Sequence, residues 1–280
     1  MFRRFLHHFF WNFYDYLGSY LAQGALLVAA LFVPLLGSGF LASMLPDGWM
    51  RAAALVMGAL AFLVLLASGT AGTLSFAEVA SRDAPARFPE FREGVRKRWK
   101  LCLRGLLVAG LAFAIAVANA GFYAHLARGS ASPAGRTGLM IAAMVFLWIA
   151  LGIAIFTLPF FAGLARFEGG VWDALRKSFV LFALAPMFWL LVFALVLSLA
   201  ALCVISVAGI VFLVPVAASA STTALWLVAQ HAGLLGQARQ DLGEGNSIGA
   251  YRRRALELGW EWEHARPKRT LRELIKPWEM

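Results

Sequence analysis

The sequence predicts an all-α protein, a polytopic membrane helical bundle with about six transmembrane helices. Three observations predict this class: 61% of residues are hydrophobic and only 14% charged, the mean hydropathy is +0.74, and six apolar runs have membrane-spanning length. A soluble domain carries about a quarter charged residues. One core of this size could not bury the surplus apolar surface, so lipid is the expected solvent.

Each of the six runs is long enough for one crossing, which takes about 20 apolar residues at 1.5 Å rise each. The last two runs are contiguous, because no charged residue occurs between Lys177 and Arg239. We place the turn that separates them at Ser206–Gly209. The expected spans are Leu17–Leu45, Ala52–Phe76, Leu103–Leu126, Gly138–Ala165, Phe179–Ser206 and Ile210–Leu235.

The distribution of bases predicts the orientation. With the N-terminus inside, all of the 25 Lys and Arg residues except Arg51, Arg128 and Arg136 fall on the inner side. Cytoplasmic loops carry such an excess of bases, so both termini are expected in the cytoplasm. The net charge of +10 could suggest a nucleic-acid partner, but the bases lie in patches between apolar runs. We therefore expect contact with the lipid bilayer and no nucleic acid.

Three basic segments precede the odd-numbered spans and have the spacing of amphipathic helices lying on the inner membrane surface. Their apolar stripes are Phe2, Phe5, Phe9 and Phe13; Phe88, Phe91, Val95 and Trp99; and Trp172, Leu175, Phe179 and Ala183. An interfacial anchor is the simpler interpretation of these helices, and a regulatory role is the alternative. The chain is thus expected to divide into a membrane domain over 1–235, built from repeated hairpins, and a cytoplasmic tail over 236–280 with short helices.

Two of the hairpins share a motif. Phe156-x-x-Pro159-x-x-Ala162 in the fourth span parallels Phe212-x-x-Pro215-x-x-Ala218 in the sixth. Each proline removes a helix hydrogen bond, so both spans are expected to kink. Kinked helices occur at transport sites but are common in membrane bundles, and packing is the favoured explanation.

Three stretches carry a family resemblance. They are Trp11-Asn-Phe-Tyr-Asp-Tyr-Leu-Gly18; Gly69-Thr-Ala-Gly-Thr-Leu-Ser-Phe76 with Phe88-Pro-Glu-Phe91 and Arg96-Lys-Arg-Trp99; and Leu158-Pro-Phe-Phe-Ala-Gly-Leu-Ala-Arg-Phe167 with Asp173-Ala-Leu-Arg-Lys-Ser178. Over roughly residues 9–235 the chain resembles the YesL-like bacterial inner-membrane proteins, a family without an assigned biochemical function.

The resemblance implies a helical bundle in the bacterial inner membrane. Family members near carbohydrate-uptake genes also imply a loose association with sugar transport, and no catalytic residue carries over. The chain departs from the family at Gln23, where members usually carry an Asn in the first span. The tail after Arg239 is not a general family feature.

The spans offer few candidates for chemistry. Gln23 and Asn119 are the deeper polar residues and could line a pathway, although a membrane amide more often bonds across a helix interface. Four acidic residues, Glu78, Asp83, Glu90 and Glu93, lie close in sequence among arginines, which is typical of solvated loop charge. The histidines lack zinc spacing and the nucleotide-binding motifs are missing. We expect no enzyme activity, no metal and no cofactor.

The tail is rich in aromatic and basic residues for a solvated segment. Aromatic side chains and Arg are enriched where proteins dock. The candidate docking residues are Trp260, Trp262, Leu271, Ile275 and Trp278. The alternative is that the tail packs on its own inner loops or on headgroups. These features predict an accessory or scaffold protein that docks a partner; a small-solute transporter is the second hypothesis and a membrane enzyme the third.

Overall fold

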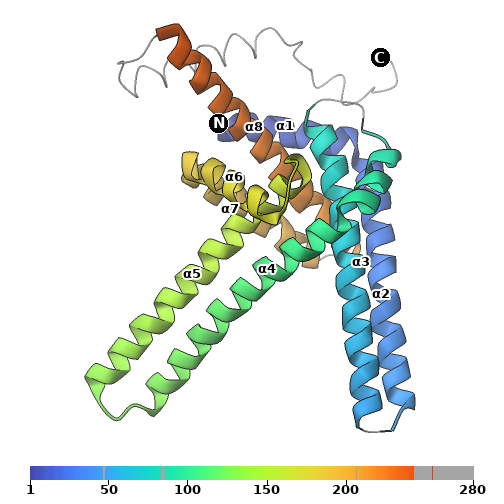
Figure 1. Ribbon diagram of the computed structural model, residues 1–280, viewed down its shortest axis with the longest axis vertical. Coiled ribbons are helices and arrows are strands. Elements are labelled where there is room, and N and C mark those ends of the chain that lie inside the picture. Colours follow the sequence, from blue (N-terminus) through green and yellow to red (C-terminus); the bar gives the residue numbers. More distant parts are fainter. Residues whose placement is uncertain (47, 83–85, 206, 243–253, 255–280) are drawn as a thin grey trace. The chain divides into compact units, whose positions relative to one another are not determined.

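The computed structural model describes residues 1–46, 48–82, 86–205, 207–242 and 254. In these ranges all regular structure is helical, which confirms the predicted all-α class. Figure 1 shows the helices in chain order: α1 (Phe2–Asp15), α2 (Leu17–Met44), α3 (Trp49–Ser81), α4 (Phe88–Gly129), α5 (Pro133–Arg166), α6 (Val171–Leu184), α7 (Pro186–Ile205), the 3₁₀ helix η1 (Val207–Phe212) and α8 (Leu213–Leu242).

Within the described ranges, six helical stretches are long and apolar enough to cross a membrane. They are α2, α3, α4, α5, α7 and the segment Gly209–Leu234, which includes most of α8. The protein is therefore a multi-pass integral membrane protein in contact with lipid, as the hydropathy predicted.

Two predicted boundaries are wrong. The expected surface helix at 88–99 and the third span are one continuous helix, α4, because no proline interrupts the chain from residue 90 to 132. The fifth span was expected from Phe179, but α6 continues to Leu184 and α7 begins at Pro186. A proline disfavours helical backbone in the preceding residue. Ala185 accordingly has φ −146° and ψ 59°, outside the helical region.

The kink expected at Pro215 is also wrong. Pro215 lies in the first turn of α8, where a backbone N–H has no helical acceptor and its loss costs nothing. Pro159, in contrast, lies inside α5, as expected, and Pro34 lies inside α2.

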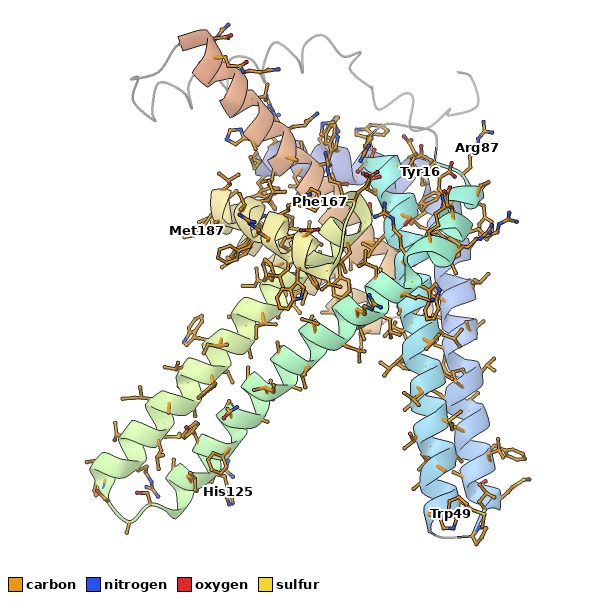
Figure 2. All side chains as sticks on the ribbon, in the orientation of Figure 1. Tyr16, Trp49, Arg87, His125, Phe167 and Met187 are labelled. Carbon is orange, nitrogen blue, oxygen red and sulfur yellow. The ribbon has the colours of Figure 1, made fainter. Side chains whose placement is uncertain are left out.

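The long helices form two antiparallel hairpins, α2–α3 and α4–α5, and α3 packs against α4. Figure 2 shows Tyr16 and Arg87 at one end of the α2–α3 hairpin and Trp49 at the other. The α3–α4 contact is close because Gly94 has no side chain. A Cβ there would meet the Ser75 side chain and the Ala71 carbonyl. Small residues let membrane helices approach in this way.

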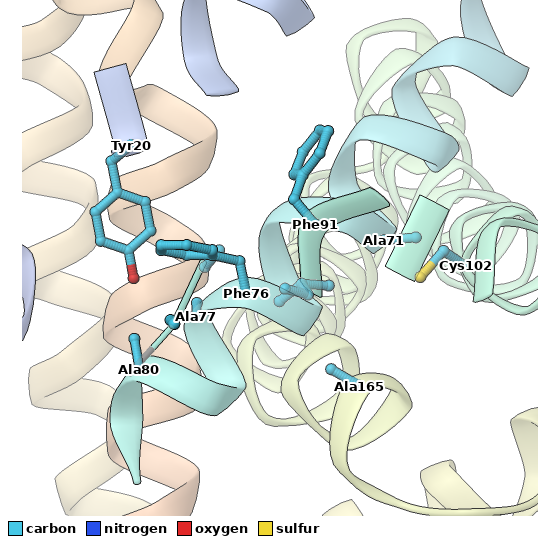
Figure 3. Close-up of a cluster of buried hydrophobic side chains, with 11 residues drawn as sticks. Tyr20, Ala71, Phe76, Ala77, Ala80, Phe91, Cys102 and Ala165 are labelled. Atoms are coloured by element: carbon cyan, nitrogen blue, oxygen red, sulfur yellow. The ribbon is translucent and has the colours of Figure 1, made fainter. Parts of the chain in front are cut away.

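α8 is the most buried of the six candidate spans. In an apolar stretch of 18 residues within this span 67% of residues are buried, against 11–17% in the corresponding stretches of the other five. A core cluster collects side chains from five helices around the α3–α4 contact (Figure 3): Tyr20, Ala71, Leu74, Phe76, Ala77, Ala80, Ala86, Phe91, Cys102, Ala165 and Ala218. This core holds the two hairpins and the start of α8 together.

Large apolar side chains are exposed along the hairpins (Figure 2). Leu36 on α2 is 66% exposed, Leu111 on α4 64% and Trp148 on α5 68%. Water would make such surfaces unfavourable, whereas hydrocarbon solvates them. The exposed side chains therefore identify the lipid-facing sides of both hairpins.

The chain divides into two compact units, Met1–Trp226 and Leu227–Met280, so the division falls inside α8. The expected division after residue 235 remains a prediction.

Candidate functional site

Gln23 occupies the most unusual environment of the predicted site residues. Its side chain on α2 is only 1% exposed. Neither Nε2 nor Oε1 has a hydrogen-bond partner among the described residues. A buried polar group without a partner costs about 1–3 kcal/mol in stability. The Gln23 amide therefore destabilises the folded protein, unless it binds a molecule other than this chain.

Tyr20, on the same helix, connects this position to uncharged polar side chains of α8. Tyr20 lies one helical turn before Gln23 and is completely buried, with its hydroxyl next to Ser219 of α8. Thr223 follows Ser219 by one turn and is also buried. The oxygens of Tyr20, Ser219 and Thr223 have no well-formed hydrogen bond within the described part of the chain. We call Tyr20, Gln23, Ser219 and Thr223 the α2–α8 polar cluster.

The α2–α8 polar cluster can donate and accept hydrogen bonds but carries no charge. Such groups suit water or a neutral polar solute rather than an ion or a charged substrate. Sequence reasoning missed Tyr20, Ser219 and Thr223, because nothing in the sequence pairs α2 with α8. The run of small hydroxyl residues at 219–223 was the available signal.

Asn119, the second predicted residue, does not share this environment. It is half-buried on α4, and its Nδ2 donates a hydrogen bond of 2.8 Å to the Ile115 carbonyl of the same helix. The amide is thus partly satisfied locally. The tail candidates Trp260, Trp262, Leu271, Ile275 and Trp278 lie outside the described residues.

A charged cavity of about 230 Å³ lies where α3, α4 and α5 meet. Its charged lining residues are Glu78, Glu90, Glu93, Lys97 and Arg98. The sequence interpretation treated the three glutamates as separate solvated charges; the structure brings them to one cavity.

The glutamates of this cavity already have polar partners. Glu78 pairs with Arg82 and Glu93 with Lys97, each four residues along a helix. Glu90 Oε2 accepts a 2.8 Å hydrogen bond from the backbone N–H of Arg87, which forms a cap at the start of α4. These contacts stabilise the helix ends and leave little capacity for chemistry.

Arg98 joins two helices at the same place. Its Nη1 donates a 2.7 Å hydrogen bond to the carbonyl of Leu164, near the end of α5. Carbonyls in the last turn of a helix lack helical donors, and a cation there is favourable. Arg98 therefore fixes the end of α5 against the start of the apolar part of α4.

A second cavity, of about 350 Å³, is lined by α3, α4, α5, α7 and α8. Its walls are apolar except for the hydroxyls of Thr70, Thr157 and Ser221. A third, of about 220 Å³, lies between α2, α3 and α4 around Leu27 and Phe91. Neither Gln23 nor Asn119 lines any of these three cavities.

In the described ranges no three His, Cys, Asp or Glu side chains gather as a metal-binding group. The fold and these sites define a polytopic α-helical membrane protein with an uncharged polar cluster in its core. Comparison of the chain with family models, curated proteins and solved structures gives no match.

Proposed function

We propose that this chain is a non-enzymatic protein of the bacterial inner membrane, an accessory or scaffold component that docks a partner through its cytoplasmic face and tail. Membership of the YesL-like family is part of the same proposal. The proposed orientation is supported by the distribution of bases, which favours α1, α6 and the tail on the cytoplasmic side.

The observation that carries the proposal is the packing of α1. Phe5 is completely buried, and its ring contacts Phe188 of α7 at a centroid distance of 5.7 Å. His8 stacks edge-on against Trp226 of α8 at 5.4 Å. A helix that only anchored the chain to headgroups would not need these contacts with two other helices.

The opposite side of α1 remains exposed. Leu6 is 38% and Phe10 52% exposed. A rigid helix with an exposed apolar and basic side is a suitable platform for a protein partner, because little conformational entropy is lost on binding. The aromatic residues of the tail would supply further docking contacts.

Site-specific photo-crosslinking tests the docking function. A photoreactive residue is placed at Phe10, at Trp278 and, as a lipid-facing control, at Leu36. Discrete protein adducts at Phe10 and Trp278 but not at Leu36 are the expected result. The same partners should be lost from affinity purifications of a truncation ending at Gln240; identical partner sets would refute docking by the tail.

A small-solute transporter is the second candidate, and the unpartnered Gln23 amide is the observation that favours it. The test uses purified protein in liposomes with a panel of neutral sugars such as glucose, maltose and ribose. Solute entry, followed by light scattering, should depend on Gln23 and fall in Gln23→Leu. Entry equal to that of empty liposomes would exclude this function for the sugars tested.

A further inference from the structure

We propose that α7, η1 and α8 form a re-entrant hairpin, which enters the membrane from the side of α1 and turns inside it. On this topology α2, α3, α4 and α5 cross the membrane, whereas the last two apolar helices do not. The inference concerns residues 1–226 and does not depend on the docking role, although its accessibility test uses the orientation proposed above.

The first step is to establish which elements share a side. If α2 to α5 each cross once, then α1, the segment after α3 and the end of α5 lie on one side. Two contacts agree with this arrangement: the Ala86 N–H donates to the Tyr16 hydroxyl, and Arg98 donates to the Leu164 carbonyl. The start of α7 is on the same side, since Phe188 packs on Phe5.

A crossing by α7 would therefore carry its end to the far side, about 30 Å away. The turn between α7 and α8 does not lie on that far side. The ring of Phe212, the last residue of η1, lies 6.1 Å from the ring of Phe13 in α1. Val211 packs against Gly24, which is seven residues after the first residue of α2 and thus about 10 Å along that helix. α2 continues for another 20 residues, about 30 Å, beyond this contact.

The length of α7 is consistent with a shallow path. Its 20 residues span about 30 Å. A helix of this length that descends only about 10 Å must lie at a steep angle to the membrane normal. α8 then leads back: Ser219 is next to Tyr20, and Trp226 stacks on His8 of α1.

The composition of the turn is an independent argument. The two turns that face the far side carry charged or polar residues, namely Asp47 with Arg51 and Arg128 to Arg136 with two serines between them. The α7–α8 turn reads Val-Ile-Ser-Val-Ala-Gly-Ile-Val-Phe over residues 204–212 and has no charge. Ile205 is 83% exposed and Val204 66%, which suits hydrocarbon and not water.

Backbone outside an α-helix is tolerated in a membrane only where protein or a water-filled cavity covers it. η1 meets this condition, because its backbone lies directly against α2 at Gly24. Discontinuous helices of this kind surround binding sites in several transporter folds. Tyr20 and Gln23 of the α2–α8 polar cluster lie within about 10 Å of the start of α2, the end of that helix that adjoins α1.

Cysteine accessibility and cross-linking test the topology in the full chain, with Cys102→Ala and Cys203→Ala as background. A membrane-impermeant maleimide is added to intact cells carrying Trp49→Cys, Ala131→Cys or Ile210→Cys. The first two variants should react from outside and Ile210→Cys should not. Reaction of Ile210→Cys at the rate of Trp49→Cys would overturn the proposal.

A second measurement covers the case in which Ile210→Cys is unreactive because the turn is merely buried. Phe13→Cys with Phe212→Cys should be joined by a short bis-maleimide cross-linker, whereas Phe13→Cys with Trp49→Cys should not. A full crossing would hold Phe13 and Phe212 on opposite sides of the bilayer. Absence of the Phe13–Phe212 cross-link in protein that folds and is expressed normally would also overturn the proposal.

Discussion

Gly24 of α2 lies directly against the backbone carbonyl of Val211 in η1. A Cβ at position 24 would overlap that oxygen and also approach the Val211 side chain. Most side-chain overlaps can be relieved by a rotamer change, but a backbone carbonyl cannot rotate away alone. The glycine is therefore required for the contact between the first helix of the α2–α3 hairpin and the α7–α8 turn.

We expect Gly24→Ala to destabilise the protein by about 1–3 kcal/mol, because η1 must move away from α2. Thermal unfolding in detergent, followed by size-exclusion chromatography, measures this effect. Gly37→Ala on the same helix is the control, since a Cβ there meets nothing within 4 Å. Equal melting temperatures for the two variants would contradict the contact.

Gln23→Leu should raise the melting temperature. The substitution removes a buried amide without partners and keeps a similar volume, so about 1–3 kcal/mol is recovered. Asn119→Leu is the matched comparison and should not stabilise, because that amide already bonds to Ile115. A lower melting temperature for Gln23→Leu would indicate that the amide binds water or a solute, as a transport pathway requires.

Gly94→Ala should loosen the packing of α3 on α4. The new methyl group meets the Ser75 side chain and the Ala71 carbonyl, and the expected loss is about 1–3 kcal/mol. Gly121→Ala in the open part of α4 should be neutral or stabilising, since alanine is the better helix former. Proteolysis rates in detergent compare the two variants; faster cleavage of Gly121→Ala than of Gly94→Ala would count against this packing.

Ser178→Ala tests the attachment of α6. The buried Ser178 Oγ donates a 3.0 Å hydrogen bond to the carbonyl of Pro159 in α5. Without this hydrogen bond α6 is held less firmly to α5, and the folded protein should be less stable by about 1 kcal/mol. Ser198→Ala is the control, because that exposed hydroxyl bonds only within α7, to Ala194. Hydrogen exchange over α6 should increase in Ser178→Ala alone.

Hydropathy was sufficient to predict the helical class and the positions of α2, α3 and α5, because each is a long apolar run between polar turns. Hydropathy failed to locate the start of α7, because no charged residue separates that helix from the preceding apolar sequence. The start of α7 was placed seven residues too early, although Pro186 carries a local signal that the preceding residue leaves the helix. The continuity of α4 was missed because an amphipathic stripe and an apolar run can belong to one helix.

The α2–α8 polar cluster could be predicted only in part. Gln23 stands out in the sequence as a polar residue in an apolar run, and it is buried. Its neighbour Tyr20 and the hydroxyls of Ser219 and Thr223 could not be assigned to the same place. Their proximity depends on pairing two helices about 200 residues apart, and single-sequence periodicity contains no information on such pairing.

The burial of α8 has a consequence for how the protein is made. The most enclosed of the six described apolar helices follows the other five along the chain, so those five are inserted before the helix that packs between them exists. Until α8 is made, the surfaces of α2 and α3 that pack against it remain uncovered. Chains interrupted before residue 213 should thus be recognised by membrane quality control as incomplete, whereas chains that include α8 should escape degradation.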